Sequence, residues 1–202
     1  SVLTRLGCHL CEVAKHQVAE IAQPAGVGCQ EIDVDPDPAL HAAKQAAAIQ
    51  PPQAIALEQL ASLYADTGNR AELDATVQAL QKVAPGHAAT WYYAGASTFL
   101  DNRFDETLRH GERALSLDRE YAPVYDLIGA AHTRLNQPEK AREAFESSLR
   151  FDAHDSSAYA NLGLLFLNAG NREAAVNYFA EALWLDADSK VARDGLAAAL
   201  NR

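Results

Sequence analysis

A pattern that repeats every 34 residues is the feature of this sequence that most constrains its fold. It is clearest between residues 156 and 189, where two groups of apolar and small side chains follow each other: Tyr159, Leu162, Gly163 and Phe166, then Ala175 and Phe179. Such spacings predict a helix, a turn and a second helix that packs against the first. Equivalent residues recur in the same register three more times without an insertion, which predicts four units at 54–87, 88–121, 122–155 and 156–189.

This pattern resembles the tetratricopeptide repeat, a helix-turn-helix unit. The resemblance rests on the fourth unit and on equivalent residues in the others, among them Trp91, Gly95, Gly129 and Phe145. It implies a mostly α fold, a right-handed α-solenoid whose first helices line a concave groove. Residues that tolerate a left-handed backbone follow each first helix and predict a tight turn there: Gly68, Asn102, Asn136 and Gly170.

The second unit and the two ends of the array depart from the pattern. Thr107 and Gly111 stand where alanine and an aromatic residue are expected, which predicts looser packing of the second helix in that unit. Residues 190–202 continue with helical periodicity. We expect them to form a C-terminal capping helix, because the end unit of a solenoid has one face without a neighbour.

Residues 1–53 have a different organisation. The sequence predicts an extended stretch, a helix that begins near Cys8, a second extended stretch, and an alanine-rich helix from about Pro38 to Ile49. The stretches LTRLGCHLCEVAKH and EIDVDPDPAL resemble the first half of a glutaredoxin-like domain of the thioredoxin superfamily. A small partial α/β segment is therefore expected before the solenoid, and its last helix also fits as the N-terminal cap of the array.

The cysteines of this segment carry its candidate chemistry. The resemblance implies that Cys8 is the attacking cysteine and Cys11 the resolving one, and a thiol at a helix N-terminus is stabilised as the thiolate. The second half of such a domain, with its hairpin and cis-proline, is not evident around Pro52, so the motif is either active or a relic. Zinc binding by Cys8, Cys11, His16 and Cys29 matches no zinc-site spacing, and no metal or cofactor is predicted.

The tetratricopeptide resemblance also implies which side chains of the first helices face the groove. These side chains are aromatic, apolar and acidic, with a single arginine. Tyr92 and Phe99 are expected at its centre, because aromatic anchors dominate many binding surfaces. The candidate groove residues are Glu58, Ser62, Asp66, Tyr92, Ala96, Phe99, Asp126, Ala130, Arg134, Asn161 and Leu164.

These residues favour one kind of ligand over another. Chaperone-binding members of the family hold a terminal carboxylate with lysines and asparagines, whereas the fifth position of the four units here carries Glu58, Tyr92, Asp126 and Ala160. A carboxylate clamp is therefore disfavoured. An aromatic and apolar groove is typical of binding to an extended peptide or an amphipathic helix.

The sequence thus favours a non-catalytic protein-protein interaction scaffold. The alternative is a thiol-disulfide oxidoreductase or redox-linked chaperone that uses Cys8 and Cys11, with the repeats selecting its clients. The net charge of −10 disfavours nucleic acid as a partner. No apolar run is long enough to span a membrane, so a cytoplasmic location is expected, while the absence of an initial methionine leaves export open. The oligomeric state is left open.

Overall fold

The computed structural model describes residues 38–47 and 54–201. Within these ranges the chain forms ten α-helices and no strand. Of the predicted partial α/β segment at residues 1–53, only the last helix is described, from residue 38 to residue 47; the parts that contain Cys8, Cys11 and Pro52 lie outside the described residues. The helices are α2 (Pro38–Ala47), α3 (Ala54–Asp66), α4 (Arg70–Val83), α5 (Ala88–Leu100), α6 (Phe104–Leu117), α7 (Ala122–Arg134), α8 (Pro138–Phe151), α9 (Ser156–Asn168), α10 (Arg172–Leu185) and α11 (Lys190–Leu200).

The eight helices from α3 to α10 recur with a period of 34 residues. Each pair has a first helix of 13 residues and a second of 14. The turn inside each pair contains one residue with a left-handed backbone, as the sequence predicted: Gly68 (φ 67°), Asn102 (φ 61°), Asn136 (φ 56°) and Gly170 (φ 79°). Only glycine and, less readily, asparagine take this conformation at low cost, so the turn positions are encoded locally.

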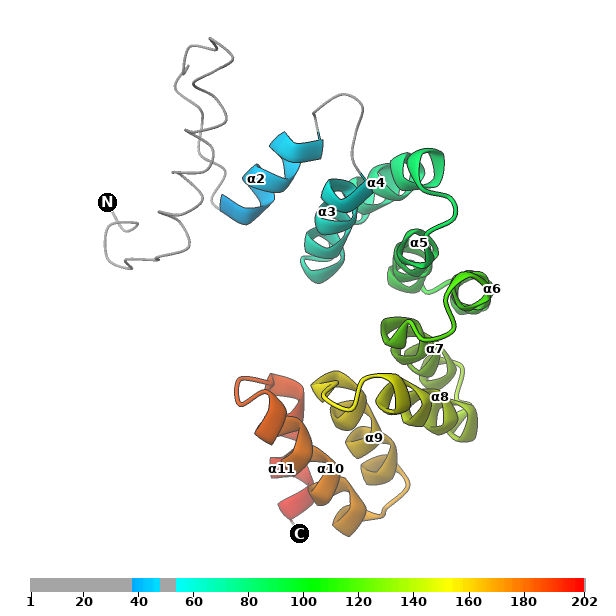
Figure 1. Cartoon of the computed structure of the whole chain (residues 1–202). Coiled ribbons are helices and arrows are strands. Elements are labelled where there is room, and N and C mark those ends of the chain that lie inside the picture. Colours follow the sequence, from blue (N-terminus) through cyan, green and yellow to red (C-terminus); the bar gives the residue numbers. More distant parts are fainter. Residues whose placement is uncertain (1–37, 48–53, 202) are drawn as a thin grey trace, which may run out of the picture.

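The helix pairs stack into a curved array (Figure 1). Each first helix packs against its own partner and against the first helix of the next pair, so that α3, α5, α7 and α9 form a continuous row. The second helices of the described chain make no comparable row, because they contact mainly first helices. The first helices therefore lie on the inner, concave side of the arc and the second helices on its outer side.

Glycines on the first helices allow the two helices of a pair to approach closely. A Cβ on Gly129 would lie 2.5 Å from Cε1 of Phe145, and one on Gly163 would lie 2.6 Å from Cε1 of Phe179. Both phenylalanine rings are fully buried. The glycine and the phenylalanine of the repeat pattern therefore pack directly against each other, one from each helix of the pair.

The second pair, α5 and α6, packs as closely as the others, so the prediction of looser packing was wrong. Gly111 and Thr107 are both buried. A Cβ on Gly111 would lie 2.8 Å from Cγ1 of Ile128, which fills the space that an aromatic side chain takes in other units. The Thr107 hydroxyl is 3.1 Å from that of Thr98, so the polar groups are paired.

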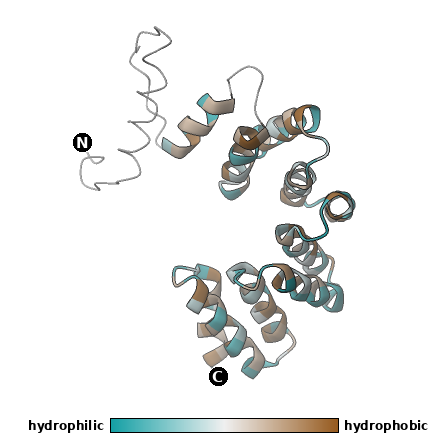
Figure 2. Cartoon of the chain, viewed as in Figure 1, coloured by the Kyte–Doolittle hydropathy of each residue, from teal (hydrophilic) through white to brown (hydrophobic). Residues whose placement is uncertain are grey.

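Helices α2 and α11 pack at the two ends of the repeat array. Ala43 of α2 belongs to the buried cluster that contains Leu57 and Leu60 of α3. At the other end, Ala192 and Ala199 of α11 are buried in a cluster with Phe179. Hydrophobic and hydrophilic residues are mixed along the helices, as expected for helices with one packed and one exposed side (Figure 2). None of the described helices has the length and apolar character needed to cross a membrane.

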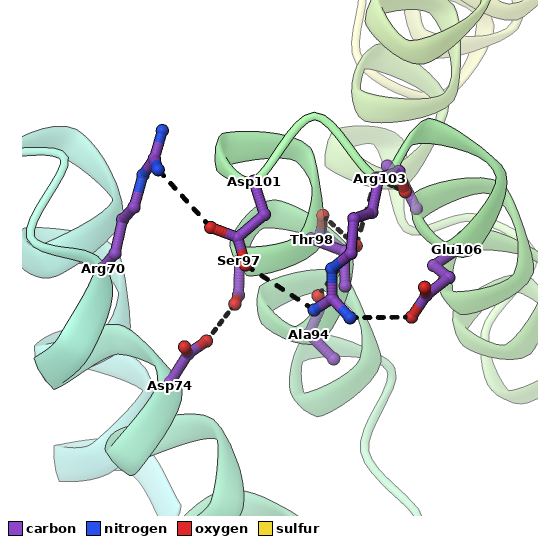
Figure 3. A network of polar contacts seen from close by, with 10 residues as sticks. Arg70, Asp74, Ala94, Ser97, Thr98, Asp101, Arg103 and Glu106 are labelled. Carbon is purple, nitrogen blue, oxygen red and sulfur yellow. Dashed lines mark hydrogen bonds and ion pairs between the residues drawn. The ribbon is translucent and has the colours of Figure 1, made fainter.

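A network of polar contacts joins α4, α5 and α6 at the end of the second pair's turn (Figure 3). Asp101 forms ion pairs with Arg70, at 3.6 Å, and with Arg103, at 3.7 Å. Arg103 also lies 3.1 Å from Glu106, and the nearby Ser97 hydroxyl donates to Asp74. Exposed ion pairs of this kind add little to stability, so the buried apolar contacts account for most of the packing between these helices.

Candidate protein-binding groove

The predicted groove residues lie on the first helices α3, α5, α7 and α9, along the concave side of the array. Near the N-terminal end, Glu58 is 3.1 Å from Nδ1 of His87, and Asp66 is exposed at the end of α3. Burial raises the pKa of Tyr93, and an interaction with the Ser62 side chain opposes that increase. Ala96 is half-buried. At the other end, Leu164 packs partly against the core between α9, α10 and α11.

An open pocket of about 360 Å³ lies between α5, α7 and the start of α9. Its walls come from three elements: Tyr92 of α5, Asp126, Leu127 and Ala130 of α7, and Asp155 and Ser157 at the start of α9. Tyr92, Asp126 and Ala130 were among the predicted groove residues. Asp155 and its neighbour Asp152, which also lines the pocket, were not, because they belong to the loop between α8 and α9 rather than to a first helix.

Asp126 is partly buried on the floor of this pocket. Its Oδ1 accepts a hydrogen bond of 3.4 Å from the Asn161 side chain. Burial, and to a smaller extent the negative charge of Asp155, raise the pKa of Asp126 to about 7, although the Asn161 hydrogen bond acts in the opposite direction. Near neutral pH this carboxyl group is therefore poised between its charged and neutral forms, and a small change in its surroundings shifts its protonation.

Asp155 is held rigidly at the N-terminus of α9. Its Oδ1 accepts hydrogen bonds from the backbone N–H groups of Ser157 at 2.9 Å and Ala158 at 3.1 Å. Its Oδ2 accepts a third from the Ser148 hydroxyl at 3.0 Å. This is a helix N-cap, in which the carboxylate satisfies amides that the helix leaves unpaired. The position of Asp155 is thus fixed by the fold, independently of any ligand.

Tyr92 forms the aromatic wall of the pocket. Its ring makes edge contacts with Tyr93, at a centroid distance of 5.0 Å, and with Tyr121, at 5.8 Å. Burial raises the pKa of Tyr92 well above its ordinary value, and the pKa of Tyr121 to about 12, so both hydroxyl groups stay protonated at neutral pH. The three tyrosines support one another, which holds the Tyr92 ring in place at the pocket.

Phe99 and Arg134 form a separate cluster at the C-terminal ends of α5 and α7. Phe99 makes an edge contact with Phe104 at 5.5 Å. The guanidinium carbon of Arg134 lies 4.9 Å from the Phe104 ring centroid, and its Nη2 donates to Asn102 at 2.9 Å. The predicted centre of the groove is therefore divided, with Tyr92 in the pocket and Phe99 among other rings. The one arginine of the predicted groove is already engaged within the fold.

Comparison with known proteins supports the repeat fold. Residues 122–155 and 156–189 match the family model described as tetratricopeptide repeat. The chain is 23% identical over 107 residues to anaphase-promoting complex subunit 3 of Schizosaccharomyces pombe, and 30% identical over 95 residues to the cell division cycle protein 27 homolog of Caenorhabditis elegans. These matches cover 53% and 47% of this chain, but only 16% and 12% of the respective relatives.

Solved structures share the same architecture. A TPR protein of Thermus thermophilus superposes with a TM-score of 0.71 over 94% of this chain and 96% of its own, at 18% identity. The APC/C hetero-tetramer Cut9-Hcn1 gives a TM-score of 0.67 at 18% identity, over 80% of this chain and 32% of that one. MamA gives 0.55 at 24% identity, over 73% and 86%. At these identities the likeness shows the fold alone, which is a helical solenoid of repeated helix pairs. The match to the tetratricopeptide repeat model covers residues 122–189 of this chain.

Proposed function

We propose that this protein is a protein-protein interaction scaffold that binds an extended segment of a partner protein along its concave groove. The observation that carries the proposal is the pocket between α5, α7 and α9, which combines a fixed aromatic wall with polar groups of the next helix. Grooves of this composition suit a peptide that inserts a side chain while its backbone follows the surface. The proposal extends to the groove as a whole, including Ser62, Ala96 and Asn161.

The relatives are consistent with a role in assembly. One of them is a subunit of the anaphase-promoting complex, as its name states. Because this chain corresponds to only 16% of that relative, the likeness supports protein binding in general and identifies no particular partner. The redox alternative rests on Cys8 and Cys11, which lie outside the described residues, and it stays a prediction from sequence, as does the cytoplasmic location.

A peptide-display selection tests the proposal. The full chain is immobilised and peptides are selected from a random library, then each is measured against two variants. Ala130→Gln places a larger side chain in the pocket, whereas Trp184→Ala changes a side chain on the second helix α10 that is 78% exposed and does not line the pocket. We expect selected peptides to bind the wild type and Trp184→Ala but to lose binding to Ala130→Gln, with equal helicity by circular dichroism. If every selected peptide binds Ala130→Gln as well as the wild type, the groove is not the site.

A further inference from the structure

The repeat geometry brings the fifth residue of a unit close to the last residue of the same unit, 29 positions later. In the first unit the two are Glu58 and His87, whose side chains are 3.1 Å apart. In the second they are Tyr92 and Tyr121, whose rings meet at 5.8 Å. In both cases the side chains are complementary, as an acid with a base and as two aromatic rings.

The third unit breaks this rule. The equivalent residues are Asp126 and Asp155, both acidic, and the charge of Asp155 raises the pKa of Asp126. Asn161, a neutral amide, is the hydrogen-bond partner of Asp126 on α9. None of the residues that line the pocket is a lysine, arginine or histidine. Carboxylates removed from water are normally paired with a cation, so this part of the groove lacks a positive charge.

The fold itself does not supply that charge. Arg134 is on the same helix as Asp126 but at its far end, where it contacts Phe104 and donates to Asn102. Asp152 adds a third acidic group at the rim of the pocket. Among the described residues, no group of three or more His, Cys, Asp or Glu side chains is arranged to hold a metal ion. The arrangement therefore fits an organic cation that also has a flat face.

We propose that this pocket receives an arginine side chain of the partner segment, whose guanidinium group lies against the Tyr92 ring and donates hydrogen bonds to Asp126 and Asp155. This inference rests on the proposed binding function of the groove and names the chemistry of its central subsite. A guanidinium group is planar, stacks on aromatic rings and offers several donors, so it can donate at once to a carboxylate on α7 and to the carboxylate that caps α9. An ammonium group of lysine is a point charge without the flat face.

The small compound Nα-acetyl-argininamide serves as the probe, and its citrulline analogue, which has nearly the same shape but no charge, is the matched control. Binding to the isotope-labelled full chain is followed by NMR, with the side-chain carboxyl carbon of Asp126 as reporter. We expect the arginine compound to lower the pKa of Asp126, because a neighbouring cation favours the charged form. With a pKa of about 7 in the free protein, binding should be about tenfold tighter near pH 8 than near pH 6.

Three results would overturn the inference. The citrulline compound could shift the same signals at the same concentrations, the lysine analogue could bind more tightly, or calcium ions could produce the same change. In Asp126→Asn, where backbone amide signals serve as the reporter in place of the missing carboxyl group, we expect the affinity for the arginine compound to fall at least tenfold, while Glu112→Gln, on the second helix α6, retains it. An unchanged response in Asp126→Asn would also overturn the proposal.

The peptide selection separates this inference from the proposed function. Peptides that need the groove but carry no enriched arginine would refute the arginine subsite and leave the scaffold function intact. A selection in which no peptide depends on the groove would refute the scaffold function. Groove-dependent peptides that share an arginine, and that lose binding when it is replaced by citrulline, would support both.

Discussion

Replacing Asp126 with asparagine should make the protein more stable at neutral and alkaline pH. The folded-state pKa of Asp126, about 7, lies above the ordinary value of 3.8. At a pH between these two pKa values, Asp126 keeps its proton in the folded protein but has lost it in the unfolded chain. The free energy of unfolding therefore falls as the pH rises through this window, and the loss is complete above about pH 7. Asparagine keeps the size of the side chain and can still accept the hydrogen bond from Asn161, but it does not titrate.

The size of the effect follows from the difference between the two pKa values. Each unit corresponds to about 1.4 kcal/mol, so a shift of about three units gives an upper limit of about 4 kcal/mol. Asp126 lines an open pocket that water enters, and solvent screening reduces this limit. We expect Asp126→Asn to be more stable than the wild type by roughly 2 kcal/mol near pH 8, with the difference shrinking toward zero near pH 4.

Urea denaturation followed by circular dichroism measures this difference at several pH values. The exposed Glu112→Gln, on the outer face of α6, is the matched control, because it removes one carboxylate that is not enclosed. Repeat arrays can unfold in parts, so tryptophan fluorescence should give the same transition before free energies are compared. A stability difference between Asp126→Asn and the wild type that does not change with pH, or that grows as the pH falls, would refute the reasoning.

Three further predictions concern the repeat architecture. Gly129→Ala should destabilise the protein by about 1–2 kcal/mol in urea denaturation, because the added Cβ meets the buried Phe145 ring. The control is Gly86→Ala, where a Cβ meets nothing within 4 Å. It should change the free energy of unfolding by less than about 0.5 kcal/mol. Asn136→Ala should cost about 1 kcal/mol, because the backbone there is left-handed (φ 56°), and Asn136→Gly should not; equal losses would contradict this. Deleting residues 190–202 should lower the melting temperature and increase light scattering, since α11 covers the core cluster of α10; an unchanged melting curve would show that α11 does not cap the array.

The helical repeat fold could be predicted from sequence because its determinants are local and periodic. A glycine or asparagine fixes each turn, and a glycine on one helix faces an aromatic ring on the next. The packing of α6 could not be predicted in this way. Its Gly111 is a poor match to the repeat pattern, but Ile128 of the following pair fills the space, and that compensation exists only in three dimensions.

The candidate site was only partly predictable for a related reason. The family resemblance assigns groove positions on the first helices, so it found Tyr92 and Asp126 but passed over Asp155 in the loop before α9. The fifth and last residues of the first two units are in contact, and those of the third unit line one pocket. The sequence shows these positions, but their proximity depends on how the repeats stack. The burial that raises the pKa of Asp126 is likewise a product of that stacking.

The comparison between units explains why the acidic pair of the third unit is informative. Glu58 and His87 show that the same geometry accommodates an acid beside a base, so nothing in the backbone requires two acids in the third unit. Burial and the neighbouring charge of Asp155 disfavour the ionised form of Asp126, so we expect this carboxylate to lower the stability of the free protein at neutral and alkaline pH. The N-cap role of Asp155 would be served equally well by serine or asparagine. The Asp126 carboxylate lines an open pocket beside the Tyr92 ring. Its unfavourable charge is explained if a ligand supplies the cation that the protein lacks. We therefore propose that the third unit, rather than the aromatic cluster around Phe99, would determine which partner the groove accepts.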